Sequence, residues 1–95
     1  MIVLNVFFKV KPEQKQNFIQ TLTHMVQESR KEAGCRHYQL GTDILDEYSF
    51  LLIEHWDDAA AIALHKQTPH WDQFIAVVES YLAEPFVIEQ YQACA

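Results

Sequence analysis

The amino-terminal segment Ile2–Val10, IVLNVFFKV, limits the fold most, because its apolar side chains occupy both parities of an extended chain. β-branched and aromatic residues dominate it, as they do in strands whose two faces are both covered. Asn5 interrupts the apolar run, and Lys11 and Pro12 end it. We therefore predict a strand that needs apolar cover on both faces of its sheet.

Two amphipathic stretches alternate with further strand-like segments. Pro12 suits the first turn of a helix, and apolar residues then recur every three or four positions as far as Ala33. Gly34 is expected to end that helix in the left-handed backbone region. The other expected elements are strands over 35–45, 49–56 and 86–92, a short helix over 59–66 capped by Asp57 or Asp58, and a helix that starts at Thr68-Pro69 and ends at Glu84-Pro85.

The order strand, helix, strand, strand, broken helix, strand is the split βαβ plan. It predicts an α+β, ferredoxin-like fold in which helices cover one face of a four-stranded antiparallel sheet. Helices on one side only would leave the second apolar face in water. We therefore expect residues 1–95 to form a single domain, and two copies to pack sheet against sheet as a homodimer.

Composition excludes several classes of partner. The formal net charge is −6 and the seven basic residues are scattered, so no nucleic acid is expected to bind. The apolar start lacks a basic leader, and no apolar run is long enough to span a bilayer, which predicts no membrane association and a cytoplasmic location. Cys35 and Cys94 have neither zinc-site nor disulfide-framework spacing, so reduced thiols are expected.

The segment FLLIEHWDDAAAIALHKQTPHW, residues 50–71, contains three of the five histidines and both tryptophans. Strand parity puts Glu54 and Trp56 on one face and His55 on the other. His65, near the end of the short helix, could reach the space between helix and sheet. His70 falls in the first turn of the next helix, where the dipole favours a neutral imidazole.

Each of these residues also has an ordinary structural interpretation. A histidine at a helix end can simply bond a carbonyl, Glu54 can be a salt-bridged strand residue, and Trp56 can belong to the core. Three further residues, Tyr38, Asn5 and Tyr91, are weaker candidates because each places a polar group on an apolar strand.

A metal site is the competing interpretation of the two histidines. His65 and His70 are five residues apart with Pro69 between them, which matches neither a single-helix pair nor an HExxH motif. Few of the nearby carboxylates are expected on the same side as the histidines. We therefore predict no metal site.

Several motifs together resemble the antibiotic biosynthesis monooxygenase domain over essentially the whole chain. The matching pieces are FKVKPE at 8–13, EAGC at 32–35 with Tyr38, LIEHWDDAAA at 52–61, and His65 with TPHW at 68–71. The resemblance implies a ferredoxin-like dimeric α+β barrel. It also implies members that oxidise quinols or anthrone-like aromatics with molecular oxygen and no metal or flavin, and a relative that processes the phosphorylated autoinducer-2 signal.

Haem-degrading relatives share this fold, but their pattern is absent here. That pattern has a tryptophan at the position of His65. It also has an iron-binding histidine late in the next helix, where this sequence has Ile75 and Val78. No haem is therefore expected.

The predicted function is a cofactor-independent monooxygenase acting on a small quinol or polyphenol, with molecular oxygen as co-substrate. Such an enzyme needs a base, donors for a developing oxyanion and a dry apolar cavity. The expected catalytic residues are His65, His70 and Glu54, and the expected substrate-binding residues are Trp56, Tyr38, Asn5 and Tyr91. Two alternatives stay open: an isomerase or lyase acting on a small diketone-like metabolite, phosphorylated or not, and a non-catalytic dimer that binds ligands.

Overall fold

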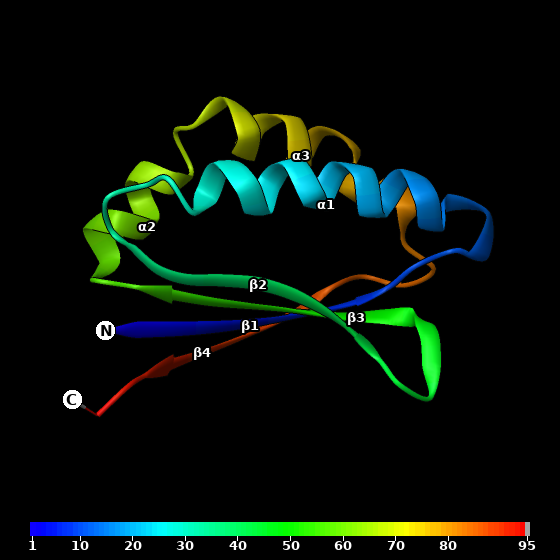
Figure 1. Ribbon diagram of the computed structural model, residues 1–95, viewed down its shortest axis with the longest axis horizontal. Coiled ribbons are helices and arrows are strands. Elements are labelled where there is room, and N and C mark those ends of the chain that lie inside the picture. Colours follow the sequence, from blue (N-terminus) through cyan, green and yellow to red (C-terminus); the bar gives the residue numbers. More distant parts are fainter. Residues whose placement is uncertain (95) are drawn as a thin grey trace.

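The computed structural model describes residues 1–94 and shows a four-stranded sheet with helices on one face (Figure 1). The elements are β1 (Ile2–Lys9), a 3-10 turn (Pro12–Gln14), α1 (Lys15–Ser29), β2 (Cys35–Asp43), β3 (Asp46–Trp56), α2 (Ala59–His65), α3 (Pro69–Tyr81) and β4 (Val87–Gln92). All neighbouring strands are antiparallel, in the order β2-β3-β1-β4. This confirms the predicted α+β ferredoxin-like fold. Within residues 1–94, no helix is long and apolar enough to cross a membrane.

The inner face of the sheet, which the helices cover, carries the even-numbered residues of β1 and β3. Phe8 and Phe50 are cross-strand partners there, and both contact Phe18 of α1, with ring centroids 5.2 and 4.9 Å apart respectively. Val78 of α3 is fully buried in the same core. Because side chains alternate along a strand, the same parity places Glu54 and Trp56 beneath the helices.

The outer face of the sheet has no helix over it (Figure 1). It carries mainly apolar residues: Val3, Phe7, Leu51, Ile53, Val87 and Tyr91. In the single chain Phe7 is 41%, Val87 56% and Tyr91 51% exposed. An apolar sheet face of this kind is typical of an interaction surface.

The β2–β3 hairpin and the end of the last helix differ from the sequence prediction. The hairpin between β2 and β3 turns at Ile44 and Leu45, where the Asp43 carboxylate accepts from the Leu45 N–H at 2.8 Å, so β3 begins earlier than expected. The last helix, α3, stops at Tyr81 rather than at Glu84. The chain is extended from Leu82 because the Ala83 N–H donates to the Lys9 carbonyl, at 2.8 Å, and this pulls the segment back to β1.

Gly34 has a different role from the one predicted. It has no positive φ, and α1 already ends at Ser29, so the expected left-handed helix stop is wrong. A Cβ atom at Gly34 would lie 2.4 Å from the Cβ of Ala61. The glycine therefore lets the turn after α1 pack directly on α2, because no side chain separates them.

Replacing Gly34 by alanine should destabilise the fold by about 1–3 kcal/mol, since neither neighbouring backbone can retreat without disturbing its packing. Urea unfolding of the single variant checks this value. The double variant Gly34→Ala/Ala61→Gly removes the close contact and should recover part of the loss, even though glycine inside a helix costs about 1 kcal/mol. Additive losses in the double variant would contradict the packing argument.

Candidate functional site

His65 is the residue around which the polar groups of the helical layer gather. It is the last residue of α2 and is 2% exposed. The Asp58 side chain caps that helix by accepting from the Ala61 N–H at 2.9 Å. The imidazole lies against the ring of Trp56, with centroids 4.6 Å apart. The structure thus places His65 between helix and sheet, as the sequence predicted.

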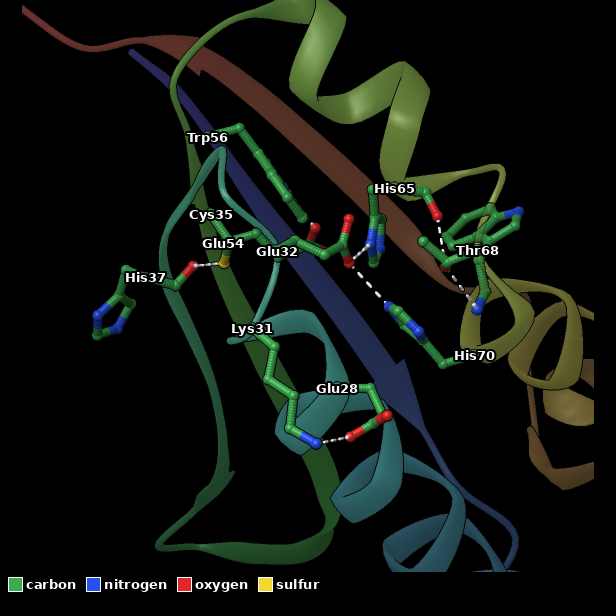
Figure 2. A network of polar contacts seen from close by, with 11 residues as sticks. Glu28, Lys31, Glu32, Cys35, His37, Glu54, Trp56, His65, Thr68 and His70 are labelled. Carbon is green, nitrogen blue, oxygen red and sulfur yellow. Dashed lines mark hydrogen bonds and ion pairs between the residues drawn. The ribbon is translucent and has the colours of Figure 1, made fainter.

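Glu32 joins His65 to His70 (Figure 2). The Nδ1–H of His65 donates to Oε2 of Glu32 at 2.6 Å, and the Nε2–H of His70 donates to the same oxygen at 2.8 Å. Glu32 lies in the turn after α1, while His70 stands in the first turn of α3, which Thr68 caps. A turn 33 residues before His65 therefore meets the neighbouring ends of α2 and α3 at one carboxylate oxygen.

This network sets the tautomer of His65. A carboxylate only accepts hydrogen bonds, so Nδ1 carries the proton and Nε2 of the neutral ring keeps a lone pair. That Nε2 atom is buried and has no hydrogen-bond partner within residues 1–94. Burial lowers the pKa of His65, although the Glu32 carboxylate acts in the opposite direction. The ring is therefore a neutral imidazole with an unused acceptor.

A cavity of about 120 Å³ lies between the sheet and the helices α2 and α3, with His65 on its wall. Glu54 and Tyr38 also border it. Lys66 and Gln90 contribute to the wall, and the rest of it is apolar: Leu4, Val6, Phe8, Leu52, Ile62, Trp71, Phe74, Phe86 and Ile88. Two larger surface hollows, of about 430 and 500 Å³, have no histidine among their lining residues, whereas one of about 420 Å³ is lined by His24 and His70. The small cavity differs from these hollows because its mostly apolar wall includes the buried groups His65, Glu54 and Tyr38.

Glu54 is the second buried titratable group at the cavity. It is 5% exposed, and its Oε1 accepts from the Trp56 Nε1–H at 2.9 Å. Burial raises the pKa of Glu54 to about 7, and the nearby Glu32 charge adds to that rise, while the Trp56 hydrogen bond opposes it. A carboxyl group with such a pKa can take up or release a proton near neutral pH.

Tyr38 reaches the cavity from β2, where it is the cross-strand partner of Glu54. It is 2% exposed. Burial, helped by the charge of Glu54, raises its pKa above the usual range, so the phenol keeps its proton. The hydroxyl group is therefore available as a donor and not as a phenolate base.

Trp56 and His70 lie behind the cavity rather than on its wall. Trp56 is fully buried between His65 and Glu54 and does not border the cavity, and its expected contact with a substrate ring stays a prediction. Trp71 and Phe74 supply the aromatic wall instead. His70 borders a separate surface hollow between α1 and α3 and is connected to His65 through Glu32.

Asn5 and Tyr91 lie on the outer face of the sheet, away from the cavity. Asn5 pairs with Ile53 and Glu89, and Tyr91 pairs with Val3. Asn5 and Val3, the partner of Tyr91, are odd-numbered residues of β1. The cavity is lined instead by the even-numbered residues Leu4, Val6 and Phe8 of that strand. Because strand side chains alternate between faces, the single chain does not bring these two polar groups to His65, and their expected part in substrate binding stays a prediction.

Glu32 is the member of this hydrogen-bond network that the sequence interpretation missed. It is 33 residues from His65 and 38 from His70, so no local spacing links them. One physical signal was present: an acidic residue just beyond a helix C-terminus opposes the helix dipole, which attracts cations there. A carboxylate in that position is a weak hint of a partner elsewhere in the fold.

The fold and the site together define a small ferredoxin-like α+β domain with a histidine–carboxylate pair at a buried apolar cavity. The chain belongs to the antibiotic biosynthesis monooxygenase family, whose model matches residues 1–77.

Three relatives illustrate this similarity. A Bacillus subtilis protein named "Putative monooxygenase YcnE" is 38% identical over 85 residues, which are 90% of each chain. The crystal structure of PA3566 from Pseudomonas aeruginosa is 32% identical, with a TM-score of 0.91, and the match covers 99% of this chain and 94% of that one. A structure from Nitrosomonas europaea, titled as a putative antibiotic biosynthesis monooxygenase, has a TM-score of 0.95 over 100% of both chains, and at 24% identity it supports the fold alone.

Proposed function

We propose that this protein is a cofactor-independent monooxygenase that oxidises a small quinol or polyphenol with molecular oxygen. Family membership and the monooxygenase name of a 38% identical relative support the reaction class. One structural observation carries the proposal furthest: the unpartnered Nε2 atom of His65, buried beside an apolar cavity. A neutral imidazole in that position is suited to take a proton from a bound hydroxyl group.

The first step is deprotonation of the substrate. The Nε2 atom of His65 accepts the hydroxyl proton, and the Glu32 carboxylate at Nδ1 stabilises the imidazolium that forms. The electron-rich anion then reduces oxygen directly. One oxygen atom enters the ring and the other leaves as water, so a hydroquinone and O2 give a hydroxyquinone and water.

Glu54 and Tyr38 are the proposed donors to the developing oxyanion. Tyr38 keeps its proton, and the Glu54 carboxyl, with a pKa of about 7, is partly protonated at neutral pH. Donors already fixed in a water-poor cavity stabilise charge that develops during the reaction. Glu32 and His70 act as positioning residues because they hold the ring of His65 rather than border the cavity.

The cavity favours a substrate with a single ring. Its volume of about 120 Å³ is close to that of an engineered apolar cavity, of about 150 Å³, that binds benzene. Trp71 and Phe74 can contact an aromatic ring there. A benzoquinol is therefore the first substrate to test.

The outer face of the sheet is proposed to pair with a second copy of the chain. It exposes Phe7, Val87 and Tyr91, and burying such apolar surface is favourable. Sedimentation velocity at micromolar concentration should give twice the 11.1 kDa of one chain. A monomer under these conditions would remove the sheet-to-sheet pairing.

Oxygen uptake with a panel of hydroquinones and catechols tests the proposed reaction. Under isotopically labelled oxygen gas, the product should gain one labelled atom per ring. Parallel incubations without oxygen, including small diketones, provide the contrasting arm. Turnover of a diketone under strict anaerobiosis, with no oxygen uptake by any quinol, would contradict a monooxygenase.

A further inference from the structure

We propose that Glu32, His65 and His70 form a binding site for a divalent transition-metal ion of the zinc type. The three donor atoms are Oε2 of Glu32, Nδ1 of His65 and Nε2 of His70, and all lie within 4.8 Å of one another. They come from the turn after α1, the end of α2 and the start of α3 (Figure 2). The fold thus supplies the carboxylate that the local sequence around the histidines lacks.

The donor set selects the class of ion. Two imidazole nitrogens and one carboxylate oxygen match the ligands of zinc and neighbouring transition ions, whereas Mg²⁺ and Ca²⁺ prefer oxygen ligands alone. The side chains of His65, His70 and Glu32 are 3%, 11% and 16% exposed. The site is therefore largely shielded from solvent. Its more accessible side is that of His70, which borders the surface hollow between α1 and α3.

The present distances are close to those that a metal requires. The two hydrogen bonds place the carboxylate oxygen 2.6 and 2.8 Å from the two nitrogens. Ligands about 2.0–2.2 Å from one ion in tetrahedral geometry stand roughly 3.3–3.6 Å apart. The carboxylate oxygen would have to withdraw by about 1 Å or less, and the two nitrogens, which lie within 4.8 Å of each other, would have to come to the same separation. The rotatable bonds of the three side chains allow both movements. The Glu32 backbone can stay in place, held by the bond from the Glu32 N–H to the Ser29 carbonyl.

Metal binding has a consequence for the cavity. An ion on Nδ1 of His65 takes the position of that proton, so the neutral ring must carry its proton on Nε2 instead. The atom beside the cavity then becomes a donor and can no longer accept a proton. The bound ion should therefore inhibit turnover, a consequence that rests on the proposed function, whereas binding itself does not.

Calorimetric titration with zinc chloride, together with the visible absorption of bound Co²⁺, tests the site without measuring activity. The wild-type chain should bind one ion, and binding should weaken as the pH falls and the imidazoles protonate. Glu32→Gln and His70→Ala each remove one ligand. Each should weaken binding by at least the 10- to 100-fold that loss of an outer-shell partner costs.

His37→Ala is the matched control. His37 and His55 form the other close histidine pair in the described chain, with ring centroids 5.0 Å apart on the outer face of β2 and β3. Affinity in this variant should equal that of the wild type. Affinity lost in His37→Ala but kept in Glu32→Gln would overturn the proposal, as would the absence of binding to a folded wild-type chain.

Circular dichroism of each variant establishes that it is folded, and Glu32→Asp, which keeps a carboxylate, should retain more affinity than Glu32→Gln. Equal affinity in these two variants would also contradict the site. Failure of the metal proposal is separable from failure of the proposed reaction. A chain that oxidises quinols without binding zinc refutes only the metal site. A chain that binds zinc through Glu32 without oxidising any quinol refutes only the proposed reaction.

Discussion

His65→Ala should lower quinol-dependent oxygen uptake by about 10²–10⁴-fold, the usual contribution of a general base. Within residues 1–94, the variant removes the only histidine that borders the cavity, together with its unpartnered Nε2 atom. His24→Ala is the matched control, because His24 is exposed on α1 and has no part in the network of Glu32. Its rate should equal that of the wild type.

Chemical rescue separates a catalytic from a structural role of His65. The substitution leaves a space between α2 and the sheet, into which added imidazole can enter and supply the missing base. A rate that rises with imidazole concentration supports proton transfer at this position. A folded His65→Ala variant with the wild-type rate would remove the residue from the mechanism.

Glu54→Gln should make the protein more stable than the wild type at pH 8, and the difference should vanish at low pH. The folded-state pKa of Glu54 is raised from 4.5 to about 7, mainly by burial, so the folded chain binds this proton more tightly than the unfolded chain does. The stability gained from this proton is fully present below about pH 4.5 and is lost as the pH rises through 7.

A shift of this size corresponds to roughly 3 kcal/mol in the free energy of unfolding. Urea unfolding between pH 4 and 8 measures it as the difference between the wild type and Glu54→Gln. Comparing the two proteins cancels the contribution of His65, whose lowered pKa has the opposite effect on stability as the pH rises. Parallel pH curves for the two proteins would show that Glu54 titrates normally.

Trp56→Phe provides a second check on the same carboxyl group. It keeps an aromatic ring in the core but removes the Nε1–H that donates to Glu54. Because that hydrogen bond lowers the pKa of Glu54, its loss should raise the pKa further. The loss of stability should then move to a higher pH. No movement would show that the hydrogen bond does not stabilise the carboxylate.

Strand parity predicted part of the site correctly. Glu54, Trp56 and His55 lie on the faces expected from their numbers, since a strand alternates its side chains strictly. Parity alone could not say how much space remains beside a residue. Trp56 therefore proved to be packed behind the cavity, and packing against His65 decided this.

The Glu32 network shows where local patterns stop being informative. The interpretation of His65 and His70 weighed only neighbours along the chain, and that argument against a metal site assumed few carboxylates nearby. The close approach of the turn after α1 to α2, which Gly34 permits, brings Glu32 to both histidines. Residue spacing cannot predict this close approach, because it depends on the contact of two elements that are far apart in sequence.

The amino-acid sequence by itself determined the order of strands and helices, the two faces of each strand and the cap at Thr68, because these depend on interactions within a few residues. It limited the other cap to Asp57 or Asp58, and the structure selected Asp58. The tertiary structure alone decided which side chains meet. It brought Glu32 into hydrogen-bond contact with His65 and His70 and left Nε2 of His65 without a hydrogen-bond partner beside the cavity. It also placed Asn5 and Tyr91 on the outer face of the sheet. The physical reason is that burial and hydrogen bonding between distant segments exist only once the sheet and its helices have packed together.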